Sequence, residues 1–368
     1  MPTVVMIRER ADGERRIALT PETAKKLKAK GLAILIESGA GQPAGFNDAD
    51  YGEDCISRDL AAVLAQADVL LCVQAPGPEL LAQLKSGALV IGALAPHRAE
   101  AQMPVYLERK LSAFALEKLP RTTRAQAMDI LSSQAGMAGY KAVLIAAQLA
   151  PRFFPMLTTA AGTIRPSKVL INGAGVAGLQ AIATAKRLGA QVEGFDVRPE
   201  TREQIESLGG KFLDLGVSAA GEGGYARALT EEERALQQSR LAEHLRNVDV
   251  IVTTAAIPGR PAPKIITDEM VAGMRRGSVI VDLAAETGGN CSLTQPGVER
   301  DCDGVLVAGP LNLASMGAIH ASEMFARNTF NFLSLMIADG GTLHIPFDDE
   351  LVAKTCMTHN GHVPEQGA

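Results

Sequence analysis

The sequence is poor in aromatic residues and has no tryptophan, no paired cysteines and no cluster of basic residues. Phe, Trp and Tyr together make up 4% of its 368 residues, whereas glycine occurs 36 times. Hydrophobic residues at 47% and charged residues at 21% are the balance of a folded globular protein. The many glycines suit an α/β protein, in which tight turns join strands to helices.

The charge of the chain argues against nucleic acid as a partner. The formal net charge is −5, and Lys and Arg do not gather in the clusters that phosphate backbones require. The length is sufficient for two domains of ordinary size.

The cysteines and apolar segments indicate the compartment. The five cysteines are odd in number and scattered without a C-x-x-C pair, which is typical of reduced thiols in a cytosolic protein; they are Cys55, Cys72, Cys291, Cys302 and Cys356. The first residues lack the apolar core of a signal peptide, and no apolar run approaches the roughly 20 residues of a membrane-spanning helix. We therefore expect a soluble, cytoplasmic protein.

Apolar strands alternate with helices along the chain. Thr20, Pro21 and Glu22 form a strong helix start, with Thr as the N-cap and Pro at the first helical position, and predict a helix over residues 22–30. A further helix is predicted over 135–149, and the alternation restarts at Lys168. Strands are predicted at residues 4–7, 33–37, 69–73, 88–94, 169–172, 191–195, 248–253 and 278–283.

This alternation predicts two α/β domains, each a Rossmann-like, doubly wound parallel sheet, arranged around a cleft. The first domain is expected to be discontinuous, with residues 1–131 joined by 322–368, because a helical apolar pattern near 322–336 returns the chain to it. The second is expected to span residues 132–321 and to carry the nucleotide motif.

A glycine-rich turn opens the second domain. Gly173, Gly175 and Gly178 have the G-x-G-x-x-G spacing and lie between a predicted strand and a predicted helix. The first glycine makes the tight turn, the second lets the backbone approach a pyrophosphate, and the third lets the helix pack on the strand. The helix N-terminus, at Val176 and Ala177, would then face the pyrophosphate.

The cofactor is indicated by the acid after the next strand. Asp196 can accept hydrogen bonds from ribose hydroxyls and repels a 2′-phosphate, so NAD is favoured over NADP. Arg198 keeps the alternative open, since a nearby arginine can bind that phosphate. Val197 beside this acid, and Ala255 after the strand that ends at residue 253, are expected to complete the cofactor site.

Several longer motifs resemble one family. GAGVAGLQAIATAKRLGA, PRTTRAQAMDILSSQAGMAGY and VIVDLAAETGGNC resemble the NAD(H)-binding domain I of proton-translocating nicotinamide nucleotide transhydrogenase, and the likeness spans nearly the whole chain. It implies hydride transfer between NADH on this chain and NADP⁺ on a partner subunit. It also implies a homodimer held at the cytoplasmic face of the inner membrane by a proton-translocating membrane component.

The same resemblance assigns a catalytic loop and a covering loop. Arg121, Gln126, Asp129 and Ser132 match the residues that hold the nicotinamide and face the partner, and Tyr225 matches a mobile loop that closes over the nucleotide. On spacing alone, Gln126, Asp129 and Ser132 would share one face of a helix, but a polar helix start after Pro120 is the favoured alternative. A surface linker is the alternative around Tyr225.

The rival hypothesis is an alanine-type dehydrogenase. That enzyme binds and protonates an oxo acid with a Lys and a His, and this chain has Gln74 and Leu94 there, although Arg16 is retained and His97 is near. Hydride transfer between two nicotinamides requires no such acid–base group. A non-catalytic NAD-sensing module is the second alternative. His359 and His362 lack further ligands, so no metal site is expected, and Cys291 and His320 are expected to be packing or supporting residues.

Overall fold

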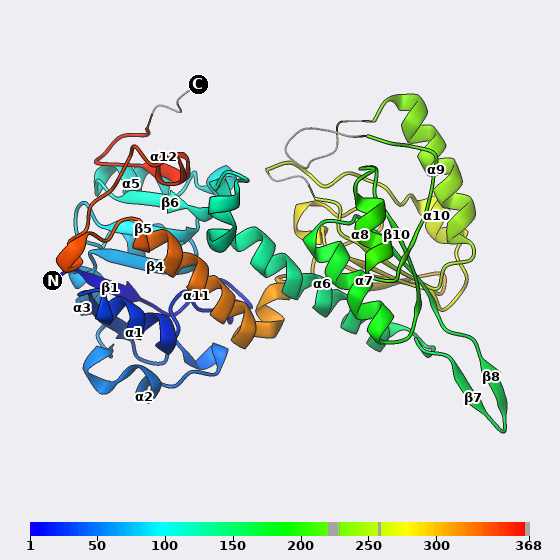
Figure 1. Ribbon diagram of the computed structural model, residues 1–368, viewed down its shortest axis with the longest axis horizontal. Coiled ribbons are helices and arrows are strands. Elements are labelled where there is room, and N and C mark those ends of the chain that lie inside the picture. Colours follow the sequence, from blue (N-terminus) through cyan, green and yellow to red (C-terminus); the bar gives the residue numbers. More distant parts are fainter. Residues whose placement is uncertain (220–226, 228, 257–258, 365–368) are drawn as a thin grey trace. The chain divides into compact units, whose positions relative to one another are not determined.

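The computed structural model describes residues 1–219, 227, 229–256 and 259–364. The chain divides into two compact units (Figure 1): unit 1 is Met1–Gln134 with Ser315–Ala368, and unit 2 is Ala135–Ala314. Helix α6, Ile130–Leu149, leads from unit 1 into unit 2.

Unit 1 is built on a seven-stranded sheet in the order β16-β6-β5-β4-β1-β2-β3. Its strands are β1 Thr3–Met6, β2 Ala33–Glu37, β3 Ile56–Ser57, β4 Val69–Gln74, β5 Leu89–Ala93, β6 Ser112–Ala115 and β16 Cys356–Thr358. The pairs among these strands are parallel, except that the edge strand β16 is antiparallel to β6. The carboxyl ends of the parallel strands therefore lie along one edge.

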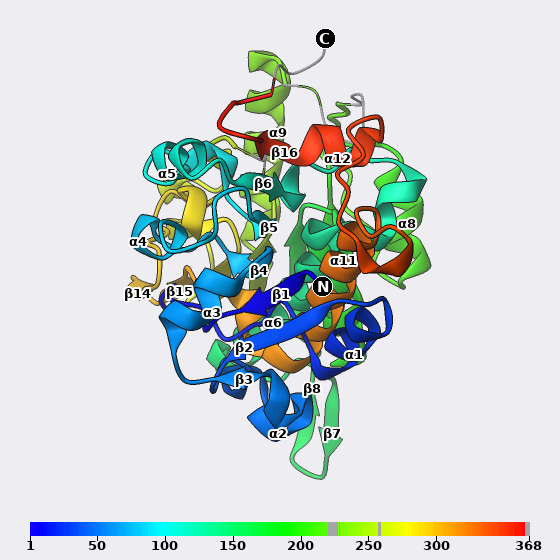
Figure 2. The ribbon, with the colours of Figure 1, turned by 90° about the vertical axis from the view of Figure 1, so that its left-hand side faces the viewer.

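Helices cover both faces of this sheet (Figure 2). They are α1 Pro21–Ala29, α2 Asp48–Tyr51, α3 Leu60–Gln66, α4 Pro78–Leu81, α5 Met103–Glu108, α11 Ala318–Ser334 and α12 Glu350–Thr355. Alternate residues of β1 point to opposite faces: Val4 joins the core under α1 and α11, and Val5 joins the core under α3 and α5. Burial on both faces explains the nearly continuous apolar strands.

Unit 2 repeats this architecture with a sheet in the order β11-β10-β9-β12-β13-β15-β14. Its strands are β9 Lys168–Asn172, β10 Gln191–Phe195, β11 Lys211–Phe212, β12 Val250–Thr253, β13 Val279–Asp282, β14 Glu299–Cys302 and β15 Val305–Ala308. Among these described strands, only the β14–β15 pair is antiparallel. The strand order reverses between β9 and β12, which is where doubly wound sheets bind ligands.

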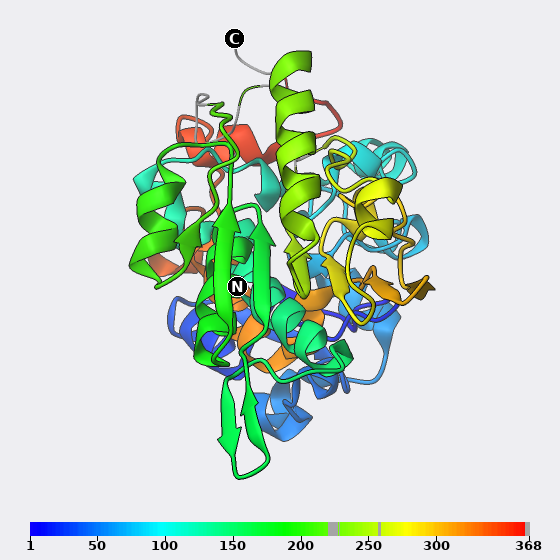
Figure 3. The ribbon, with the colours of Figure 1, turned by 90° about the vertical axis from the view of Figure 1, so that its right-hand side faces the viewer.

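The helices of unit 2 also lie on two faces: α7 Val176–Arg187 and α8 Thr201–Ser207 on one, α9 Glu231–Leu245 and α10 Asp268–Ala272 on the other. The C-terminal half of α6 packs with α7. A separate hairpin of β7, Leu157–Thr159, and β8, Gly162–Ile164, protrudes from this unit (Figure 3).

The predicted fold class, two doubly wound Rossmann-like sheets, is confirmed. Thr20 caps α1 as expected, accepting a hydrogen bond from the Thr23 backbone N–H. Helix α6 begins at Ile130, five residues before the predicted start at Ala135, because Asp129 caps it. Within the described residues, no helix is both long and apolar enough to cross a membrane.

Candidate functional site

The glycine turn lies at the carboxyl end of β9, between the ends of two neighbouring strands. The Gly173 N–H donates to Phe195 O at the end of β10, and the Thr254 hydroxyl donates to Gly173 O at 3.0 Å. Gly173 has φ of +100°, which a side chain would strain. A Cβ there would also lie 2.5 Å from the Thr254 hydroxyl. Packing therefore requires the first glycine.

The other two glycines differ sharply in the space around them. A Cβ on Gly178 would lie 1.8 Å from Gly173 O, whereas a Cβ on Gly175 would meet no atom of the described residues within 4 Å. Gly175 is the N-cap of α7, and no described side chain caps this helix. The first helical residue, Val176, is 46% exposed. The backbone N–H groups of Val176 and Ala177 are thus at an open helix end, which attracts anions.

Asp196 follows β10 and is paired with Arg198. Its Oδ1 accepts from Arg198 N and Nε, both at 2.9 Å, and its Oδ2 accepts from Arg198 Nη2 at 2.7 Å and from Ala174 N at 2.8 Å. Burial by itself would raise the pKa of Asp196, but these bonds outweigh it and lower the pKa. The carboxylate is therefore charged at neutral pH and bound to the residue that sequence reasoning set against it.

A cavity of about 190 Å³ adjoins Asp196. The Phe212 ring lines it, with the Arg202 guanidinium 4.4 Å from the ring centroid. The remaining lining residues are Val197, Pro199, Asp214, Gly216, Val217 and Ser218. An apolar ring beside a buried carboxylate is the combination that small-molecule sites present.

Ala255, after β12, is held by a buried asparagine that sequence analysis missed. The Ala255 N–H donates to Asn290 Oδ1 at 3.1 Å, and Asn290 Nδ2 donates to Ala255 O at 2.7 Å. Asn290 is fully buried, as is Asp282, which accepts from Thr253 Oγ1 at 2.9 Å. These bonds fix the edge of β12 beside the glycine turn. The sequence signal was the paired glycine before Asn290, which marks a turn after β13.

The loop expected to be catalytic lies in unit 1 and is partly explained by helix capping. Asp129 accepts at Oδ1 from Ser132 N at 3.0 Å and at Oδ2 from Ser132 Oγ at 2.5 Å. This is an N-cap arrangement for α6. Gln126 instead lies in a 3₁₀ segment, Thr123–Met128, that precedes the helix. The expectation of one shared helical face is therefore wrong, because the helix starts only after Asp129.

Gln126 and Arg121 are exposed on this loop, which α11 supports from beneath. Asn328 and Asn331 both donate from Nδ2 to Ala127 O at 2.9 Å, and Asn328 Oδ1 accepts from Ser133 Oγ at 2.7 Å. Arg124 pairs with Asp349 of the α12 N-cap. The loop thus has a fixed backbone and outward side chains. Nothing in the apolar pattern of α11 had indicated these asparagines.

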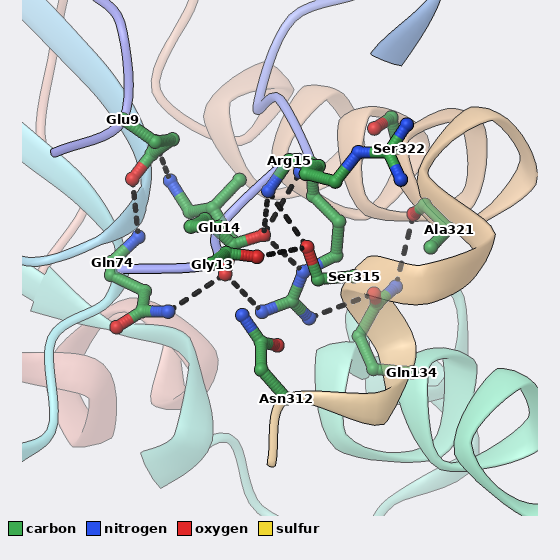
Figure 4. A network of polar contacts seen from close by, with 12 residues as sticks. Glu9, Gly13, Glu14, Arg15, Gln74, Gln134, Asn312, Ser315, Ala321 and Ser322 are labelled. Atoms are coloured by element: carbon green, nitrogen blue, oxygen red, sulfur yellow. Dashed lines mark hydrogen bonds and ion pairs between the residues drawn. The ribbon is translucent and has the colours of Figure 1, made fainter. Parts of the chain in front are cut away.

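Gln74 and Arg16 meet in a buried cluster in unit 1 (Figure 4). Arg16 binds both oxygens of Glu14, at 2.9 and 2.7 Å, and Gln74 Nε2 donates to Glu14 Oε2 at 2.7 Å. Arg16 Nη1 also donates to Gln134 at 3.0 Å. Burial would raise the pKa of Glu14, but the Arg16 bonds prevail and lower it to about 2. Glu14 thus pairs with this arginine inside the protein.

Other residues singled out from the sequence have ordinary surroundings. Cys291 is buried, and burial raises its pKa, whereas His320 is exposed on α11 and so packs no core. His359 contacts Ser112 Oγ at 2.9 Å. No metal-binding group of His, Cys, Asp or Glu occurs in the part of the chain that is described. Tyr225 lies outside the described residues.

Comparisons with known proteins agree with this geometry. The model of the alanine dehydrogenase/PNT N-terminal domain matches residues 5–138, and that of the C-terminal domain matches residues 142–366. The first of the two chains that form NAD(P) transhydrogenase subunit alpha in Rhodospirillum rubrum is 44% identical over 372 residues, covering 98% of this chain and 97% of that protein. Alanine dehydrogenase of Halomonas elongata is 26% identical over 367 residues, covering 97% and 93%.

A solved structure extends the likeness to three dimensions. The crystal structure of transhydrogenase from Sinorhizobium meliloti superposes with a TM-score of 0.89 at 42% identity, covering 98% of this chain and 100% of that one. The expected resemblance to transhydrogenase is thereby confirmed, with the alanine dehydrogenase more distant. Both halves of this chain belong to the alanine dehydrogenase/PNT family, on the side of the transhydrogenase alpha subunits.

Proposed function

We propose that this protein is the NAD(H)-binding subunit of a proton-translocating transhydrogenase, transferring hydride between NADH and NADP⁺ bound on a partner subunit. The observation that carries the proposal is the open helix end at Gly175, beside a charged Asp196, in a chain 44% identical to a transhydrogenase alpha subunit. Proton movement would belong to a membrane component, to which the partner subunits attach this chain.

The residues of unit 2 fit a dinucleotide. The N–H groups of Val176 and Ala177 would hold the pyrophosphate, because no described atom fills the space over Gly175 and the helix dipole favours an anion. Asp196 would accept the ribose hydroxyls of the adenosine, and the cavity lined by Val197 and Phe212 is suited to the adenine. Ala255 would border the cofactor from β12. Bound NADH would supply the hydride.

The loop of unit 1 would position the reacting rings. Gln126 and Arg121 are exposed, whereas the backbone beneath them is anchored by Asn328. Hydride transfer depends steeply on placement, so a fixed loop with outward polar groups suits the task. Asp129 and Ser132 would contribute mainly by holding the start of α6 in register with this loop.

The dehydrogenase alternative is disfavoured by the cluster around Glu14. An oxo-acid enzyme requires a cation free to bind a carboxylate and a group that transfers a proton. Here both guanidinium contacts of Arg16 to Glu14 are internal, and Gln74 carries no titratable proton.

A homodimer is part of the proposal, and the β7–β8 hairpin is the surface that supports it. A lone two-stranded hairpin is marginally stable in water, and the exposed Phe153, Met156 and Ile164 lie on or just beside it. A second copy would cover this apolar surface. Sedimentation of Met156→Glu as a monomer, with the wild type a dimer, is the expected result.

The decisive test is a hydride-transfer assay on the purified chain, with and without an NADP(H)-binding transhydrogenase subunit. We expect transfer only when the partner is present, and no oxidation of NADH with pyruvate and ammonia. Turnover with pyruvate would establish the dehydrogenase instead. NADH binding without transfer in the presence of a competent partner would leave the sensing module.

A further inference from the structure

Asp196 has its full complement of hydrogen bonds without any ligand. A carboxylate offers about four lone-pair positions, and four N–H groups fill them: Ala174 N, Arg198 N, and Arg198 Nε and Nη2. The Asp196 side chain is 8% exposed and that of Arg198 is 19% exposed. The pair is therefore partly shielded from water, where its hydrogen bonds are charge-assisted.

The four bonds are of two kinds. The two from backbone N–H groups are part of the glycine turn and of the chain after β10, so they persist as long as unit 2 is folded. The two from the guanidinium depend only on the side-chain rotamer of Arg198. A ligand that offers two adjacent hydroxyl donors can take the place of these two bonds and of no others.

We infer that Arg198 is a competing occupant of the ribose-binding carboxylate: it must swing away before the two ribose hydroxyls of the adenosine can bind Asp196. This rests on the proposed function, in which Asp196 receives that ribose. The protein with Arg198 folded onto Asp196 is incompetent to bind, and the measured affinity for NADH is reduced by the fraction of molecules in that state. Arg198 thereby sets the affinity without itself holding the nucleotide.

The inference makes a prediction opposite to that for an ordinary ligand-binding arginine. Arg198→Ala should tighten NADH binding about fivefold, equivalent to about 1 kcal/mol, in equilibrium titrations of NADH fluorescence. Arg198→Lys, which keeps the charge but cannot bind both carboxylate oxygens in fork geometry, should tighten it by less. With 2′-deoxy-NADH the gain should fall below about twofold, because one of the two competing hydroxyls is missing.

Arg275→Ala is the matched control. Arg275 is an exposed arginine of the same unit that bonds Asn247 before β12, at the opposite end of the sheet. Its removal changes the net charge equally and should leave NADH affinity within about twofold of the wild type, since exposed charges are well screened. Thermal unfolding of each variant checks that unit 2 is intact.

Weaker NADH binding by Arg198→Ala would overturn the inference and assign Arg198 a direct contact with the nucleotide. Equal tightening with NADH and 2′-deoxy-NADH would also overturn it, because competition with the ribose diol would not be the cause. Absence of NADH binding by the wild-type protein is a different outcome, which would refute the proposed function itself.

Discussion

Replacing Gly175 by alanine isolates the contact between backbone and pyrophosphate from the stability of the fold. Gly175 has φ of −76°, which alanine adopts freely, and the added Cβ would meet no atom of the described chain within 4 Å. Gly175→Ala should therefore unfold within about 1 kcal/mol of the wild type, as an unstrained Gly→Ala change does. The methyl group would nevertheless occupy the space through which a pyrophosphate approaches α7.

The expected result is a loss of NADH affinity of at least about tenfold, which requires only about 1.4 kcal/mol. Gly178→Ala supplies the contrast. Its Cβ would lie 1.8 Å from Gly173 O and 3.2 Å from Thr254 Oγ1, and the backbone must shift to relieve the overlap. We expect Gly178→Ala to lose about 3 kcal/mol of unfolding free energy, a large part of the stability of a domain.

Two measurements on each variant test this reasoning: urea denaturation followed by circular dichroism, and titration of NADH fluorescence. Gly175→Ala should separate the two quantities, with normal stability and impaired binding, and Gly178→Ala should lose both. A Gly175→Ala protein that binds NADH as tightly as the wild type would show that no pyrophosphate lies against this helix end, and would remove the main support for the proposed cofactor site.

Gln126→Asn should slow the hydride step about tenfold or more in single-turnover stopped flow with the partner subunit, and leave NADH affinity unchanged, because only the placement of the reacting groups is altered. Asn328→Leu should also slow it through the loop backbone; the neighbouring Thr329→Val, which removes a bond to Ala18 O instead, should reduce stability alone. Asn172 is buried, and its Nδ2 has no partner among the described residues, so Asn172→Val should stabilise the fold against urea by about 1 kcal/mol. The pKa of Glu14 is lowered from 4.5 to about 2, so its ionised form contributes stability that is complete above pH 4.5 and is lost as the pH falls towards 2. Glu14→Gln should reduce this acid-induced loss by at most about 3 kcal/mol in pH-dependent unfolding.

Local sequence determined the elements that lie closest to the candidate site. The apolar run before Gly173 and the glycine spacing predicted β9, the turn and α7, because strand, turn and helix start all depend on neighbouring residues. Thr20 and Pro21 likewise marked the start of α1. The domain boundaries at 131/132 and 321/322 stay a prediction; by its internal contacts the chain changes unit at Gln134/Ala135 and at Ala314/Ser315.

Tertiary structure decided the partners of the polar groups. Asp196 and Arg198 could be read from the sequence as rivals for one ribose, yet in the fold they bind each other, because the chain after β10 turns Arg198 back onto the carboxylate. Asn290 and Asn328 were invisible as supporting residues, since their bonds join segments about 35 and 200 residues away. Spacing by three suggested a shared face for Gln126 and Asp129, but the cap at Asp129 ends one segment and begins the next. Periodicity reports the neighbours within an element, and only the packed chain determines which side chains from distant elements satisfy one another.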